Sequence, residues 1–125
     1  MKNQIIENIN GRAYLINAFK GREGWSYLPR LTKYVFPFVS YLFNEDKSDE
    51  VIMGQLTELL TGENQKEVEQ LLVDLVSNIE VDNMRIDFDR EFGQNYDAFL
   101  LLVIKVIQLN YFDSFQRLVT NLPKA

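Results

Sequence analysis

The sequence contains no cysteine and no histidine among its 125 residues. The lack of cysteine excludes disulfide bonds, thiolate nucleophiles and sulfur-ligated metal or iron–sulfur centres. The lack of histidine removes the commonest metal ligand and the side chain whose ordinary pKa lies near neutral pH. A catalytic site would have to rely on carboxylates and lysines, so we expect a protein that is not an enzyme and holds neither a metal nor a cofactor.

Excess positive charge and long apolar runs are also missing. The net charge is −5 and the 13 basic residues are spread along the chain, so the cationic surface that neutralises phosphates in nucleic-acid complexes is absent. The longest uninterrupted apolar run, 98–104, is far shorter than the roughly 20 residues of a membrane-spanning helix. No apolar signal-peptide stretch follows Met1. We expect a soluble, cytoplasmic protein that binds neither nucleic acid nor a membrane.

Apolar and aromatic residues, in contrast, are plentiful. They include nine Phe, six Tyr and one Trp, and 46 % of the chain is hydrophobic. This content is sufficient for the core of one domain. Because no repeat, low-complexity tract or linker divides the chain, we expect a single domain over residues 1–125.

Two short segments have the pattern of β-hairpins. Apolar alternation on both sides of Asn10-Gly11 predicts a hairpin over about residues 4–17, because this dipeptide favours the positive φ angles of a type I′ turn. The predicted register places Ile9 opposite Arg12 and Ile5 opposite Ile16. A second, smaller hairpin is predicted over 79–86, around Asp82-Asn83.

Apolar residues at helical spacing predict four main helices, over about residues 26–43, 49–61, 65–78 and 95–110. In the first helix we expect Ser26 as the N-cap and Pro29 in the first turn, with Gly21 and Gly24 in a preceding break. The last helix is apolar on nearly every side and should lie at the centre of the fold. A short closing segment is predicted to follow it, with apolar residues Phe112, Phe115, Leu118 and Val119.

The predicted fold is therefore mainly α (α+β). It comprises an N-terminal β-hairpin followed by a bundle of about four to five helices, with the second small hairpin.

A series of tyrosines in the first predicted helix is the main candidate for a binding site. They recur every seven residues beside a separate stripe of core-type residues, and other aromatic side chains lie near them in the sequence. One interpretation is a wide buried arc with hydroxyls at the surface. The other is an aromatic ridge that binds a partner helix. The candidate partner-binding residues are Trp25, Tyr27, Tyr34, Phe36, Tyr41 and Phe43.

Alternating carboxylates at Asp87, Asp89 and Glu91 resemble the start of a calcium-binding loop. Such a loop needs glycine at its sixth position and glutamate at its twelfth, where this chain has Phe92 and Ala98. We therefore interpret the segment as an acidic helical turn that ends at Gly93. A carboxylate-dependent enzyme would require the three acids to converge in a deep pocket.

Several segments together resemble a family of tail assembly chaperones from long-tailed bacteriophages and prophages. The segments that carry the resemblance are the Asn10-Gly11 hairpin, a Leu-Pro-Arg-Leu sequence at 28–31, the Phe-Asp-Arg-Glu-Phe-Gly-Gln-Asn-Tyr sequence at 88–96, and the apolar helix that ends at 108–112. The resemblance covers most of the chain. Two features depart from the family pattern: Glu91 stands where many relatives have histidine, and 93–95 rearranges the usual loop.

The resemblance implies a non-catalytic chaperone that binds the apolar tape measure protein and helps to recruit tail tube subunits. Such proteins act in the host cytoplasm and do not enter the mature virion. Self-association is left open. The alternative is a general cytoplasmic adaptor or inhibitor that acts through protein–protein contacts.

Overall fold

The computed structural model describes residues 3–37, 54 and 57–123. The chain forms two compact units, one of residues 1–20 and 75–125 and the other of residues 21–74. The α+β class predicted from the sequence is confirmed, with an antiparallel hairpin at the N-terminus and helices over most of the remainder. The single domain over 1–125 stays a prediction.

The first unit opens with the predicted hairpin. Strands β1 (Gln4–Ile9) and β2 (Arg12–Asn17) pair antiparallel, with Ile9 opposite Arg12 and Ile5 opposite Ile16. At the turn, Asn10 and Gly11 have φ angles of 51° and 80°, the left-handed conformation that a type I′ turn requires. The local turn chemistry thus fixes the register, as predicted.

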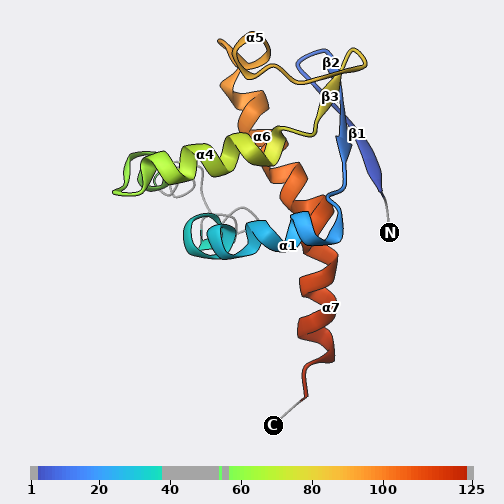
Figure 1. Ribbon diagram of the computed structural model, residues 1–125, viewed down its shortest axis with the longest axis vertical. Coiled ribbons are helices and arrows are strands. Elements are labelled where there is room, and N and C mark those ends of the chain that lie inside the picture. Colours follow the sequence, from blue (N-terminus) through green and yellow to red (C-terminus); the bar gives the residue numbers. More distant parts are fainter. Residues whose placement is uncertain (1–2, 38–53, 55–56, 124–125) are drawn as a thin grey trace. The chain divides into compact units, whose positions relative to one another are not determined.

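The second hairpin is also present and extends the same sheet. Strands β3 (Glu80–Val81) and β4 (Met84–Arg85) flank Asp82 and Asn83, which both have positive φ angles. Leu15 of β2 pairs with Glu80 of β3, so the strand order is β1-β2-β3-β4. Strands β1, β2 and β3 of this sheet are labelled in Figure 1. The longer strand β1 therefore lies at one edge of the sheet, and β4 lies at the other.

The C-terminal helix is longer than predicted. Helix α6 (Tyr96–Ile107) continues through a π-helical turn, η2 (Gln108–Phe112), into helix α7 (Asp113–Asn121). The prediction that the helix ends near residue 110 is wrong. No glycine or proline occurs between 96 and 121, and the π-helical turn keeps the backbone continuous. The first strong helix breaker is Pro123, just after the observed end.

This continuous helix, Tyr96–Asn121, has a mean hydropathy of 1.5 over its most apolar window, and is long and apolar enough to cross a membrane by length and composition alone. The core helix of a soluble protein meets the same criterion, and α6 contributes Ala98, Leu102, Val103, Val106 and Ile107 to the buried residues. Of that apolar window, 33 % is buried inside the structure.

The buried side chains of the first unit come from the sheet and the residue before β3, from the end of α4 (Gln65–Val76), from the end of the short helix before α6, and from the long helix. Among the described residues all of them are apolar or aromatic: Tyr14, Ile16, Leu75, Val76, Ile79, Val81, Phe92, Ala98, Leu102, Val103, Val106, Ile107 and Tyr111. The short helix α5 (Phe88–Phe92) precedes α6 and ends before Gly93, as predicted.

The second unit begins with helix α1 (Gly21–Arg30), which continues as a π-helical segment, η1 (Leu31–Val35). The predicted start at Ser26 is wrong. Gly21 and Gly24 lie inside the helix, and the Ser26 hydroxyl donates to the Glu23 carbonyl oxygen over 2.6 Å instead of capping. Pro29 consequently lies inside α1 and not in its first turn. Because proline lacks a backbone N–H, Pro29 donates no hydrogen bond to the preceding turn of the helix.

The structure describes only some of the residues for which the other helices of this unit were predicted. Residues 57–61 are helical and the helix ends before Gly62, as predicted. Helix α4 begins at Gln65 as predicted, but ends at Val76 and not at 78. Its apolar face, Val68, Leu71, Leu72, Leu75 and Val76, is buried. Residues 38–53, 55 and 56, which include the end of the first predicted helix and the beginning of the second, lie outside the described residues.

Candidate functional site

The aromatic residues predicted to bind a partner differ in accessibility. Trp25 in α1 is 74 % exposed, whereas Tyr27, Tyr34 and Phe36 are half-buried. Tyr41 and Phe43 lie outside the described residues. Of the described candidates, Trp25 therefore offers the largest apolar surface.

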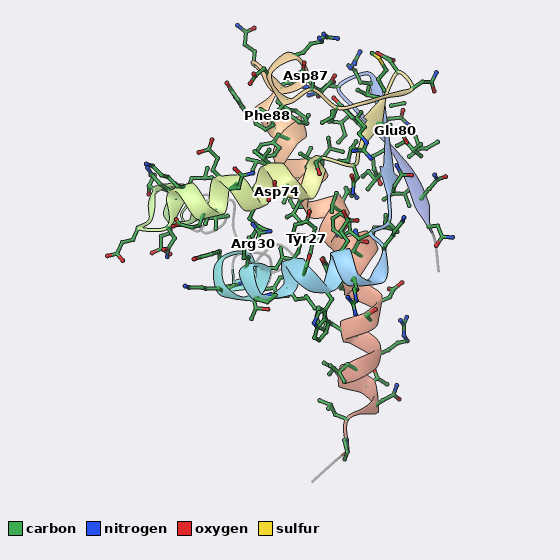
Figure 2. The ribbon with its side chains drawn as sticks, in the orientation of Figure 1. Tyr27, Arg30, Asp74, Glu80, Asp87 and Phe88 are labelled. Carbon is green, nitrogen blue, oxygen red and sulfur yellow. The ribbon has the colours of Figure 1, made fainter. Side chains whose placement is uncertain are left out.

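Tyr27 belongs to a polar cluster between α1 and α4 (Figure 2). The Arg30 guanidinium carbon lies 5.4 Å from the centre of the Tyr27 ring, and Arg30 Nη1 lies 3.5 Å from Asp74 Oδ2. Gln70 donates to the other Asp74 oxygen over 2.8 Å. Burial, together with the nearby carboxylates of Glu23 and Asp74, raises the pKa of Tyr27. The Tyr27 ring thus makes a cation–π contact with Arg30 of the same chain.

Tyr34 has a similar neighbour, because Lys33 Nζ lies 5.2 Å from the centre of its ring. The rings of Tyr27 and Tyr34 therefore each already contact a cationic side chain. Trp25 differs from both in its exposure.

Helix α7 carries a second apolar surface, which we name the C-terminal stripe. It consists of Phe112, Phe115, Leu118, Val119 and Leu122, all exposed, and α7 itself contains no buried residue. The spacing of three and four residues places these side chains along one side of the helix. Four of these residues, Phe112, Phe115, Leu118 and Val119, were predicted to belong to a short closing segment, and in the structure they are exposed.

The other side of α7 is polar. A shallow surface depression there is lined by Asp113, Gln116, Arg117, Thr120 and Asn121. Helix α7 is therefore amphipathic, with its apolar side at the surface. Amphipathic spacing could have drawn attention to it in the sequence, but spacing alone does not distinguish a core-facing stripe from a partner-facing one.

A charged cluster links the N-terminal hairpin to α5. Arg12 donates from Nε to Glu91 Oε2 over 2.8 Å and from Nη2 to Glu91 Oε1 over 2.9 Å, a bidentate pair. The Tyr14 hydroxyl donates to Glu91 Oε2 over 2.6 Å. Arg12 also lies 3.1 Å from Asp82 in the turn of the second hairpin. Charge-assisted bidentate pairs of this kind fix geometry strongly.

This environment alters the pKa values of the cluster. Burial alone would raise the pKa of Glu91, but the hydrogen bonds from Arg12 and Tyr14 outweigh it and hold that pKa below its ordinary value. Burial and the neighbouring Glu91 raise the pKa of Tyr14 to about 12. Glu91 thus remains ionised and Tyr14 remains protonated at neutral pH, the states that favour their hydrogen bond.

The acidic residues of α5 do not form a common site. Asp87 caps the helix, accepting from the Arg90 backbone N–H over 3.4 Å, and Glu91 binds Arg12 and Tyr14. Asp89 is exposed. Among residues 3–37, 54 and 57–123, no group of three or more acidic side chains has the arrangement of a metal site. The convergence that a carboxylate-dependent enzyme would need is not observed at these three acids.

Aromatic rings pack where α5 meets α6. The Phe88 ring lies 5.2 Å from that of Phe92 and 4.9 Å from that of Phe99, both in edge-to-face orientation. The Asn10 side chain donates to Asn95 Oδ1 over 2.7 Å and to Asp97 Oδ2 over 3.1 Å. Both departures from the family pattern, Glu91 and residues 93–95, therefore lie beside contacts with the N-terminal hairpin.

A family model described as "Phage tail assembly chaperone protein, TAC" matches residues 10–123, nearly the whole chain. Neither a curated protein nor a solved structure matches at a significant level. The match includes both hairpins' turns, α1 and the whole of the long C-terminal helix. The chain therefore belongs to the phage tail assembly chaperone family.

Proposed function

We propose that this protein is a non-catalytic chaperone that binds the tape measure protein and helps to recruit tail tube subunits during tail assembly. It acts in the host cytoplasm and is absent from the mature virion. Family membership supports a role in tail assembly. The C-terminal stripe on α7 supports the choice of an apolar helical partner.

The stripe supports this partner because of its length and its exposure. Val119 is 68 % exposed and Leu118 and Leu122 are 54 % exposed each, which is unfavourable in water for a helix without a partner. A second amphipathic helix can cover such a stripe with side chains at the same spacing of three and four residues. A tape measure protein rich in apolar helices provides this surface. The net charge of −5 keeps the resulting complex soluble.

The aromatic residues predicted from the sequence remain proposed contacts. They are Trp25, Tyr27, Tyr34, Phe36, Tyr41 and Phe43. The exposure of Trp25 makes it the most suitable anchor, because large exposed aromatic side chains dominate the energy of many protein interfaces.

Co-expression with the tape measure protein tests the proposal. The double substitution Leu118→Asp/Val119→Asp places two charges on the apolar side of α7. The double substitution Gln116→Asp/Thr120→Asp places the same charges on its polar side and serves as the matched control. No substituted residue is buried, so both variants should fold, which circular dichroism checks.

We expect the tape measure protein to stay soluble with the wild type and the control, and to precipitate with the stripe variant. Equal solubility with all three proteins would rule out the stripe as the binding surface. If the wild type did not increase the solubility of the tape measure protein at all, the function itself would be wrong. Pull-down of a different partner from host lysate would then favour the adaptor or inhibitor. Affinity capture with tail tube protein tests recruitment separately.

A further inference from the structure

Strand β1 is an edge strand, because no other strand of the part of the chain that the structure describes pairs with its outer side. In the two-residue hairpin, Ile9 and Arg12 form a hydrogen-bonded pair, and such pairs recur at every second residue. The 2.8 Å bond from the Ala18 N–H to the Asn3 carbonyl oxygen follows the same series. The N–H and C=O groups of Ile5, Glu7 and Ile9 therefore point toward β2. Those of Gln4, Ile6 and Asn8 point away from it.

This edge carries one of the usual protections against pairing, the charge of Glu7, which lies opposite the buried Tyr14 on the core side of the sheet, and lacks the others. Natural edge strands are commonly shortened, or carry lysine, proline or a bulge. Strand β1 has six residues in regular register with β2 and contains no proline or lysine. Its one charged residue, Glu7, lies 3.9 Å from Lys105 Nζ on α6. Ile6, at the middle of the edge, is 65 % exposed and lines a shallow hollow with Gln4 and Leu15.

We propose that β1 is a self-association edge, on which β1 of a second copy of the chain pairs antiparallel about a two-fold axis at Ile6. This register places Ile6 opposite Ile6 of the second copy and Gln4 opposite Asn8. Each outward-pointing N–H and C=O group then faces a group of the opposite kind, so the hydrogen-bonding pattern of the edge is complementary to itself. Such self-complementarity is the property that a two-fold symmetric interface needs.

The side chains are compatible with this register. The two Ile6 side chains meet on one face of the extended sheet, each beside its own Leu15, and together form an apolar cluster across the axis. Gln4 and Asn8 meet on the same face, where amide side chains can exchange hydrogen bonds. Each Glu7 lies opposite Ile5 of the other copy, so no two carboxylates are directly opposed.

Single cysteine variants test the register directly, because the natural chain has no cysteine. At a hydrogen-bonded antiparallel pair the Cα atoms are about 5.5 Å apart, within the range that a disulfide bridges. Under mild oxidation, Ile6→Cys should therefore form a covalent dimer. Asn8→Cys is the matched control, because two copies of residue 8 would be separated by roughly 13 Å along the strands. A mixture of Gln4→Cys and Asn8→Cys proteins should crosslink to each other.

Solution measurements complete the test. Light scattering of the wild type should show a monomer–dimer equilibrium that shifts with concentration. Ile6→Lys should abolish the dimer, whereas Met84→Lys, an equally exposed change on β4, should preserve it. Ile6 makes no backbone hydrogen bond to β2, so both variants keep the hairpin, as circular dichroism can verify. A wild type that stays monomeric, as expected if β1 accepts a strand of another protein, would overturn the proposal. So would equal crosslinking of Ile6→Cys and Asn8→Cys, which indicates parallel or random contact.

Discussion

The Tyr14 hydroxyl donates a 2.6 Å hydrogen bond to Glu91, which also receives two hydrogen bonds from Arg12. Tyr14 is fully buried and the Glu91 side chain is only 7 % exposed. These residues are 77 positions apart in the sequence. This contact joins the N-terminal hairpin to α5, and through α5 to the long helix that carries the C-terminal stripe.

Replacement of Glu91 should destabilise the protein. Glu91→Gln removes the charge that binds Arg12 and weakens the acceptor of the buried Tyr14 hydroxyl, with an expected cost of about 1–3 kcal/mol. Urea denaturation followed by circular dichroism measures it. Asp89→Asn makes the same chemical change at an exposed position on α5 and should shift the free energy of unfolding by less than about 0.5 kcal/mol. Equal effects of the two substitutions would contradict the role of Glu91.

The lowered pKa of Glu91 predicts that the protein loses stability in acid. Because the pKa of Glu91 is lower in the folded protein than its ordinary value of 4.5, the unfolded chain binds the proton more readily. The stabilisation is thus complete above the ordinary pKa and is lost as the pH falls through the lower, folded value. Urea midpoints measured between neutral pH and strong acid should fall less steeply for Glu91→Gln than for the wild type. Parallel curves would show that Glu91 contributes nothing to this dependence.

The raised pKa of Tyr14 predicts that the protein also loses stability in alkali. Its pKa is raised from 10.0 to about 12, so the folded protein retains a proton that the unfolded chain has already released. This stabilisation is complete below pH 10 and is lost as the pH rises through the folded value. In an ultraviolet titration, Tyr14 and Tyr27 should both ionise later than an ordinary tyrosine, and the amplitude of this late ionisation should fall by one tyrosine in Tyr14→Phe. An unchanged late amplitude in the variant would show that the late ionisation belongs to other tyrosines.

Glycine at the tip of the first hairpin should be essential for its turn. Gly11 has a φ of +80° and a Cβ there would meet no atom within 4 Å, so the cost of Gly11→Ala arises from the backbone alone. The left-handed conformation costs an alanine about 1–2 kcal/mol. Gly21→Ala, in equally open space but without a positive φ, should be neutral or slightly stabilising. Thermal unfolding of both variants provides the comparison, and a stable Gly11→Ala protein would exclude the predicted strain.

Local sequence chemistry predicted the segments whose structure depends on near neighbours. Asn10-Gly11 and Asp82-Asn83 each favour positive φ angles, so both hairpins and the register of the first could be predicted. The apolar spacing of α4 identified its buried face. The start of α1 was mispredicted because Ser26 resembles a cap and Gly21 a break, whereas in the structure both are helical. Local preferences of this size, about 1 kcal/mol, are readily outweighed by tertiary packing.

The candidate site was less accessible to sequence reasoning. The Tyr27 and Tyr34 series could be recognised by its spacing, but the cations beside both rings depend on side-chain conformations that spacing does not specify. In the sequence, Glu91 could be recognised only as one of three alternating carboxylates and as a departure from the family pattern. Its binding to Arg12 requires two segments 79 residues apart to meet.

The sequence by itself determined the two hairpin turns, the helical character of most of the chain and its chaperone family, because these follow from turn residues, periodicity and short motifs. Only the tertiary structure decided that Leu15 pairs with Glu80 to join the hairpins, that Glu91 binds Tyr14, and that Val119 is exposed. The physical reason is that an apolar side chain at helical spacing gains a similar free energy of burial in the core of its own chain or against a partner protein. Which of the two surrounds it depends on residues far away in the chain.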